Sequence, residues 1–187
     1  SLPHSLPISG EAYVIYGHGG SFPTDKNAIY FSTTELDGTQ AYDHAGWSVS
    51  SAGDFNGDGI ADILVGAIVA GTSGGYTGAA YLVFGHQNGL SPLVNLSGMD
   101  GKSGVILAGV SPYELAGFSV SSAGDFNGDG FDDVIVSAPY ADATGTNAGS
   151  IYVVFGHGGA FPAEIHLGAL SGTDGFKIQG LAAGDYT

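Results

Sequence analysis

The chain has 187 residues with 34 glycines, no cysteine, and 18 acidic residues against three lysines, which gives a net charge of −15. Nucleic acids and anionic membranes bind proteins through Lys and Arg, so this charge argues against both as partners. The lack of cysteine rules out a disulfide framework and a thiolate zinc site. No apolar run is long enough for membrane insertion, and aromatic and β-branched residues without helical periodicity indicate an all-β fold.

The first 38 residues predict two strands. One lies at Ala12–Tyr16, an apolar run that ends at a glycine, and the other lies around Ala28–Ser32 or Thr34–Asp37. The sequence from Tyr13 to His18 is similar to the sequence from Tyr81 to His86, which belongs to the second half of a longer unit. Residues 1–38 are therefore expected to form half of such a unit.

Residues 39–109 predict one complete unit of four strands, each ended by glycine or a polar turn. These strands lie near Trp47–Gly53, Ile63–Ile68, Ala79–Phe84 and Val105–Ala108. Residues 110–187 repeat the unit 71 positions later. The strands of this second unit lie near Phe118–Gly124, Val134–Ala138, Ser150–Phe155 and Phe176–Gln179.

Four antiparallel strands that recur with this period are typical of the blades of a β-propeller. The sequence therefore predicts four-stranded antiparallel sheets, as two complete blades and a preceding half blade. A β-helix is the competing fold, but its repeats are much shorter. Trp47 and Phe118 occupy equivalent positions in the two units and are expected to pack between neighbouring blades.

One acidic stretch occurs twice without a change, at residues 48–59 and 119–130. The stretch begins a loop whose positions are counted from Asp54 in the first copy and from Asp125 in the second. Side-chain oxygens stand at positions one, three, five and nine of this loop, and the main-chain carbonyl at position seven adds a fifth oxygen. Alternate oxygen ligands on a glycine-containing loop suit Ca²⁺, and three carboxylates favour it over the more hydrated Mg²⁺. We expect two Ca²⁺ sites, with the ligands Asp54, Asn56, Asp58, Ile60 and Asp62 in loop 54–62 and Asp125, Asn127, Asp129, Phe131 and Asp133 in loop 125–133.

An EF-hand begins in the same way, but it needs a bidentate Glu at position twelve and a helix on each side. Position twelve is Val65 in one copy and Val136 in the other, and both lie in β-branched runs that predict strands. The loops are therefore expected to connect strands. The alternative is a polar hairpin without metal, although a plain turn does not need four oxygens at fixed offsets.

These residues carry a resemblance to a known family. The sequence resembles the FG-GAP repeats of integrin α-subunit propellers, and more closely those of bacterial integrin-α-like proteins. The stretches that match are Gly117-Phe118-Ser119-Val120, the loop from Asp125 to Asp133, Val136-Ser137-Ala138-Pro139 and Tyr152-Val153-Val154-Phe155-Gly156. The chain departs from the family pattern at Ala45 and Ala116, where phenylalanine is common, and at Ile68 and Ser137.

The resemblance implies one Ca²⁺ in each loop, on the face of the propeller opposite the one that meets partners. It places partner contacts on Ala70–Gly78 and Tyr140–Gly149, and between blades around Asp43-His44 and Tyr113-Glu114. The expected function is a calcium-binding, secreted or cell-surface module for binding, adhesion or scaffolding, with a protein or a glycan as ligand. Plain solvated loops are the alternative reading of these connections.

Two and a half blades cannot close a propeller, and an open arc leaves two bare sheet edges. We therefore expect either that the chain is a fragment whose further blades lie elsewhere, or that copies associate into a ring or filament.

We expect no catalytic residues in this chain. His18, His86 and His157 share one slot after the third strand of their units, which favours a turn role. Asp43-His44 is the other candidate pair, but adjacent residues rarely face each other productively. No nucleophile elbow or phosphate loop is present. The enzymatic alternative is that the chain is the propeller part of a secreted, phospholipase-like hydrolase whose catalytic domain lies elsewhere.

Overall fold

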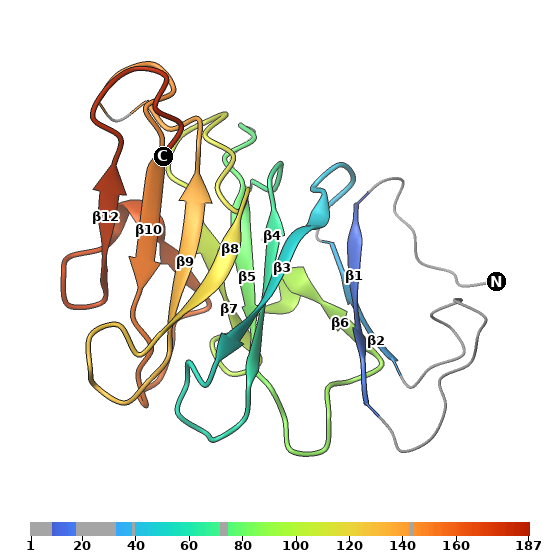
Figure 1. The fold of residues 1–187 in the computed structure, drawn as a ribbon. Helices are drawn as coiled ribbons and strands as arrows, with labels where there is room; N and C mark the ends of the chain where they lie inside the picture. Colours follow the sequence, from blue (N-terminus) through green and yellow to red (C-terminus); the bar gives the residue numbers. More distant parts are fainter. Residues whose placement is uncertain (1–8, 18–32, 39, 72–74, 143) are drawn as a thin grey trace.

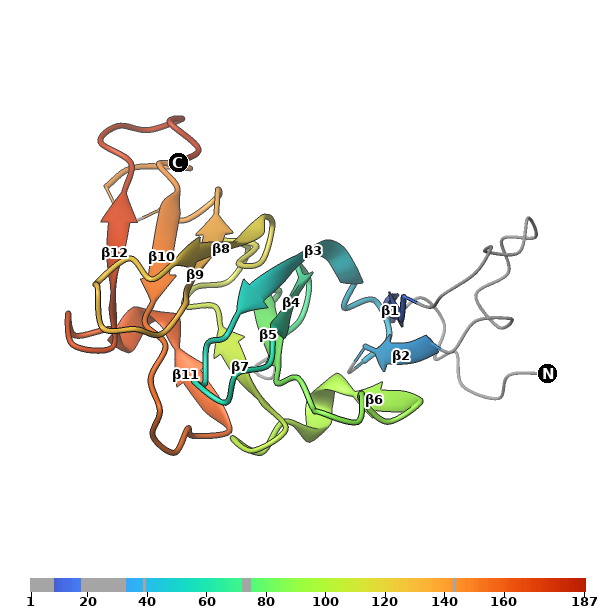
Figure 2. The same ribbon diagram turned by 60° about the horizontal axis from the view of Figure 1, so that its bottom comes forward.

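The computed structural model describes residues 9–17, 33–38, 40–71, 75–142 and 144–187 (Figure 1). Its strands form three sheets that follow one another in chain order as an arc (Figure 2). The all-β propeller-blade fold predicted from the sequence is confirmed. Within these ranges, no helix is long and apolar enough to cross a membrane.

The half blade consists of β1 (Glu11–Ile15) and β2 (Thr33–Asp37), which pair antiparallel. The prediction of a strand at Thr34–Asp37 is thus confirmed, whereas the other candidate, 28–32, lies outside the described residues. Leu36 of β2 is buried.

The two complete blades have the same order, in which each strand pairs antiparallel with the next. The first contains β3 (Ala45–Gly53), β4 (Asp62–Ala67), β5 (Ala79–Val83) and β7 (Gly104–Ala108). The second contains β8 (Val120–Gly124), β9 (Asp133–Ala138), β10 (Ser150–Val154) and β12 (Gly175–Gln179). All eight strands lie within about two residues of the predicted positions.

Two short strands were not predicted. β6 (Leu93–Asn95) pairs parallel with β2 of the half blade, and β11 (Glu164–His166) pairs parallel with β7 of the first complete blade. Each is followed by a 3₁₀ helix, η2 (Leu96–Gly98) or η3 (Leu167–Ala169). Every outer strand that has a following blade is therefore covered by a segment of that blade.

The core lies between the blades. One cluster joins the half blade to the first complete blade and includes Leu36, Val65, Tyr81, Val83 and Leu96. The other joins the two complete blades and includes Leu64, Leu82, Leu107, Val136, Tyr152 and Leu167. In the first complete blade, the central strands β4 and β5 are apolar on both faces because their sheet is packed on both sides.

The prediction for Trp47 and Phe118 was right about their contact and wrong about their burial. Their ring centroids lie 5.7 Å apart across the two blades. However, Trp47 is 52% and Phe118 38% exposed. β3 is the edge strand of its sheet, so the start of this strand is covered only by the neighbouring blade.

The leucine of η3 offers a test of the packing between blades. Leu167 is 1% exposed and belongs to the cluster between the complete blades. Leu167→Ala is expected to lower the free energy of unfolding by about 2–5 kcal/mol, because it deletes buried methyl groups and leaves a cavity. Urea unfolding measures this change.

Leu181→Ala is the matched control, because Leu181 is 93% exposed, and a change within about 0.5 kcal/mol is expected there. Equal losses for the two variants would contradict the assignment of Leu167 to the core.

Candidate metal centres

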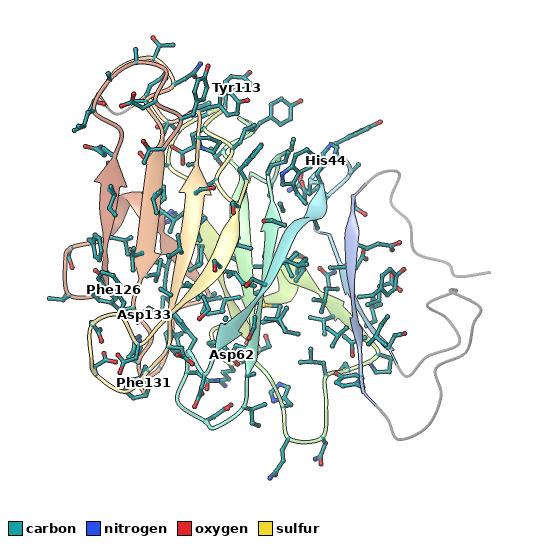
Figure 3. The ribbon with its side chains drawn as sticks, viewed as in Figure 1. His44, Asp62, Tyr113, Phe126, Phe131 and Asp133 are labelled. Carbon is teal, nitrogen blue, oxygen red and sulfur yellow. The ribbon has the colours of Figure 1, made fainter. Side chains whose placement is uncertain are left out.

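The two acidic loops connect the first and second strands of the complete blades, as predicted. Loop 54–62 joins β3 to β4, and loop 125–133 joins β8 to β9. Figure 3 shows Asp62, Asp133 and Phe131 at the same end of the molecule. The flanking elements are strands, so the EF-hand alternative is excluded for both loops.

The side chains at positions one, three and five fold the first loop by accepting main-chain hydrogen bonds. Asp54 Oδ2 accepts from Gly59 N, Asn56 Oδ1 from Asp58 N, and Asp58 Oδ1 from Ile60 N, each at 2.9 Å. Gly57 and Gly59 have φ of 74° and 84°, in the left-handed region that glycine adopts freely.

The second loop repeats these three bonds at the equivalent residues. Asp125 Oδ2 accepts from Gly130 N, Asn127 Oδ1 from Asp129 N, and Asp129 Oδ1 from Phe131 N, each at 3.0 Å. The same three side chains, at positions one, three and five, therefore fold each loop into one compact turn.

The carboxylate at position nine lies beneath each loop and is buried. Asp62 accepts from Phe55 N at 3.0 Å and from Gly85 N at 2.8 Å, one bond for each oxygen. Burial raises the pKa of Asp62 to about 6, although the amides of Gly85 and Phe55 act in the opposite direction. Asp133 makes the equivalent bonds to Phe126 N and Gly156 N, both at 2.9 Å.

The donor set suits a hard cation in its chemistry, because every predicted ligand atom is an oxygen. A carboxylate oxygen that accepts one N–H keeps a free lone pair. In addition, Asp54 Oδ1 is buried without a hydrogen-bond partner, and such an atom is costly unless a cation or water satisfies it. Among the described residues, no three Asp, Glu, His or Cys side chains converge on one point as metal ligands. The assignment of the ten ligands therefore stays a prediction.

The connections that the resemblance assigns to partners lie at the other end of the molecule. Figure 3 shows Tyr113 and His44 there, away from Asp62 and Asp133. The rings of Tyr76 and Tyr113 lie 5.8 Å apart, and those of Tyr140 and Tyr186 lie 5.7 Å apart. All four tyrosines are exposed.

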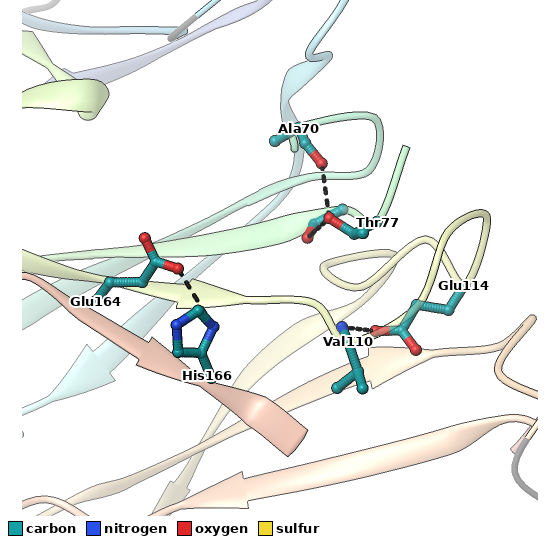
Figure 4. A network of polar contacts seen from close by, with 7 residues as sticks. Ala70, Thr77, Val110, Glu114, Glu164 and His166 are labelled. Atoms are coloured by element: carbon teal, nitrogen blue, oxygen red, sulfur yellow. Dashed lines mark hydrogen bonds and ion pairs between the residues drawn. The ribbon is translucent and has the colours of Figure 1, made fainter. Parts of the chain in front are cut away.

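A cleft of about 410 Å³ lies beside β5, β7 and β11. Figure 4 shows its polar groups: His166 Nδ1 lies 3.4 Å from Glu164 Oε1, and Thr77 Oγ1 donates to the carbonyl of Ala70 at 3.3 Å. A catalytic hydroxyl needs a base within hydrogen-bond reach. The hydroxyl of Thr77 is instead directed to a main-chain carbonyl.

His86 and His157, which follow the third strand of their units, each accept a hydrogen bond within the turn that comes after that strand. Gly89 N donates to the carbonyl of His86 at 2.8 Å, and Gly159 N donates to His157 Nδ1 at 3.0 Å. His18 lies outside the described residues. Asp43 is buried and accepts from Gln40 N at 2.6 Å, whereas His44 contacts the ring of Trp47. These contacts favour structural roles for the candidate acid–base residues.

Comparison with known proteins finds two copies of a family repeat in the chain. The model of the FG-GAP repeat matches residues 45–83 and 116–154. The first match begins with β3 and ends with β5, and the second ends with β10. Each match therefore contains one acidic loop and the three inner strands of one complete blade.

Longer alignments relate the chain to two kinds of protein. It is 31% identical over 153 residues to the phosphatidylinositol-glycan-specific phospholipase D of Rattus norvegicus, and 38% identical over 117 residues to that of Homo sapiens. It is 30% identical over 138 residues to integrin alpha-5 of Xenopus laevis. These alignments cover 79%, 62% and 73% of this chain but 17%, 14% and 12% of the relatives. The chain thus spans less than a fifth of each relative.

Glu114 gives a pH-dependent test of the polar network in Figure 4, in which its Oε1 accepts from Val110 N. Burial raises the pKa of this carboxyl above its ordinary 4.5, although the Val110 amide acts in the opposite direction. The folded state therefore holds the proton more tightly than the unfolded chain does. The resulting stabilisation is full below the ordinary pKa and is lost as the pH rises through the folded pKa.

Glu114→Gln keeps an acceptor oxygen but cannot ionise. We expect the free energy of unfolding of the variant, relative to the native chain, to rise as the pH increases above the ordinary carboxyl value of 4.5. Urea titrations in chelator at several pH values measure this difference. A difference that does not change with pH would show that the carboxyl titrates alike in both states.

Proposed function

Because residues 45–83 and 116–154 are FG-GAP repeats, the chain belongs to the FG-GAP repeat proteins, and on this premise we propose that it is a calcium-binding propeller segment. Its role is to bind or scaffold a partner outside the cell, without catalysis of its own. The single observation that supports this best is the recurrence of the same folded oxygen-rich turn in both blades.

In this proposal, each loop holds one Ca²⁺ through its side chains at positions one, three, five and nine and the carbonyl of Ile60 or Phe131. The ion supplies positive charge to three carboxylates that otherwise repel one another. The chain carries 18 acids against three lysines, so its own side chains offer little compensation. Calcium is therefore expected to act as a link between the first and second strands of each blade.

The partner surface in this proposal is the end of the propeller that carries the exposed tyrosines, away from the acidic loops. Tyrosine presents a large apolar ring with a polar tip, which suits both protein and glycan ligands. The connections at this end come from both complete blades. A protein or a glycan is the proposed ligand.

The relatives include an enzyme, the phospholipase D, as well as integrins. Each is far longer than this chain, so its activity does not transfer with the repeats. The alternative is that this chain is the propeller part of a secreted hydrolase whose catalytic domain lies elsewhere. An assay for phosphodiester hydrolysis by a parent protein that contains these repeats distinguishes a binding module from the propeller part of a hydrolase.

A second candidate function is assembly with further blades, of the same or another chain. β1 pairs only with β2 among the described strands. A groove of about 650 Å³ lies between it and the first complete blade, lined by Val14, Val49 and Ile63 among others. In the complete blades, the second strand pairs on the side of the third strand where β1 has no neighbour among the described strands. The groove therefore fits the inner strands of another blade.

The calcium proposal predicts a stability change that depends on the metal. Asp58→Asn keeps the oxygen that accepts from Ile60 N but removes one ligand charge, and Asp129→Asn does the same beside Phe131 N. Each variant is expected to lose about 2.7 kcal/mol of stabilisation when free Ca²⁺ is a hundred times its dissociation constant. Thermal unfolding with calcium and with chelator measures the loss.

Asp100→Asn is the matched control, because Asp100 is an exposed aspartate outside both loops that also accepts main-chain amides. The control should behave alike with and without calcium. A native chain whose melting temperature is the same in calcium and in chelator would overturn the proposal.

The assembly proposal predicts the mass in solution. Light scattering is expected to give a multiple of the 18.7 kDa chain mass, and Val49→Lys is expected to restore the single chain, since a charge in the groove opposes docking of apolar strands. A native mass of one chain, with and without calcium, would contradict self-assembly.

A further inference from the structure

The two acidic loops have almost the same sequence but different surroundings. Phe55 of the first loop is 0% exposed, whereas the equivalent Phe126 is 62% exposed. The first loop is covered by the second blade, and the ring of Phe55 lies 5.4 Å from that of Phe161. The described residues contain no corresponding cover for the second loop.

The cover includes hydrogen bonds to the main chain of the first loop. Asp132 Oδ2 accepts from Asp54 N at 2.7 Å, and Asp132 N donates to the carbonyl of Asp54 at 3.2 Å. His157 N donates to the carbonyl of Phe55 at 3.0 Å. Three bonds from the second repeat therefore hold the first two residues of the first loop.

The approach of Asp132 is close enough to depend on glycine. A Cβ at Gly53 would lie 2.1 Å from Asp132 Oδ2, and Gly53 has φ of 70°. At the equivalent Gly124, a Cβ would meet no atom within 4 Å. The residue equivalent to Asp132 in the first repeat is Ala61, so only the second repeat carries this carboxylate.

The side chain of Asp54 reflects this contact. Its Oδ1 is buried and has no hydrogen-bond partner, whereas Asp125 Oδ1 accepts from Gly128 N and from Asp129 N. The first loop thus offers a ligand oxygen that no amide engages, next to the additional negative charge of Asp132. Both features favour a cation at the first loop.

We propose that Asp132 is a positioning residue for the first calcium loop, so that this site is completed by the following repeat and binds Ca²⁺ more tightly than the second. This inference rests on the proposed calcium function. Asp132 touches no predicted ligand oxygen through its own carboxylate; it acts through the main chain of Asp54. Partners that orient metal ligands in this way commonly change metal affinity by about 10–100-fold.

The test is calorimetric titration with Ca²⁺ of chains in which one loop is disabled. With Asp129→Asn disabling the second loop, Asp132→Ala is expected to weaken binding at the first loop by about tenfold or more. Asp132→Asn keeps the acceptor for Asp54 N without the charge, and its affinity is expected to lie between those of the native residue and alanine.

The reciprocal background is the control. With Asp58→Asn disabling the first loop, Asp132→Ala is expected to change binding at the second loop by less than about twofold, because Ala61 stands at the same position of the first loop. An equal loss in both backgrounds would assign Asp132 a general role in folding and would overturn the inference.

The outcomes separate this inference from the proposed function. If the native chain binds two calcium ions and Asp132→Ala leaves the affinity of the first loop unchanged, the role of Asp132 is overturned and the calcium function stands. A native chain that takes up no calcium would overturn both.

Discussion

The structure depends on one repeated interaction, the buried carboxylate at position nine of each acidic loop. Asp62 and Asp133 each join the second residue of their loop to a glycine 23 positions further along the chain, through main-chain amides. A buried carboxylate is costly unless its oxygens are hydrogen-bonded, and here each oxygen accepts at least one amide. The loop, the second strand and the end of the third strand are thereby fixed together in both blades.

The loop geometry that follows from this link explains why acidic residues can gather in a chain with so few lysines. Most carboxylates of both loops accept hydrogen bonds from main-chain amides rather than from basic side chains. Amide dipoles compensate the charge only in part, because they carry no net charge. The proposed calcium ions would complete this compensation, and the buried, unpaired Asp54 Oδ1 marks where the first loop lacks it.

Much of this arrangement is predictable from the sequence, because the 71-residue repeat places every strand of the complete blades twice. The ligand pattern of the loops is equally local, since alternate oxygens and glycines specify the turn. Contacts between repeats are not predictable in this way. β6 and β11 are too short for a periodic pattern, the exposure of Trp47 depends on which neighbour covers β3, and Asp132 acts on residue 54 across a blade boundary.

The parallel strands β6 and β11 have a consequence for how such a chain can change in length. The outer strands β2 and β7 each complete their hydrogen bonding with three residues that belong to the next blade, so the sheet and the repeat do not share a boundary. If one blade were gained or lost with boundaries at the edges of its sheet, an outer strand would be separated from the short parallel strand that covers it. A duplication of one full period at any phase preserves the pairing, which makes the period, rather than the blade, the natural unit of inheritance in this architecture.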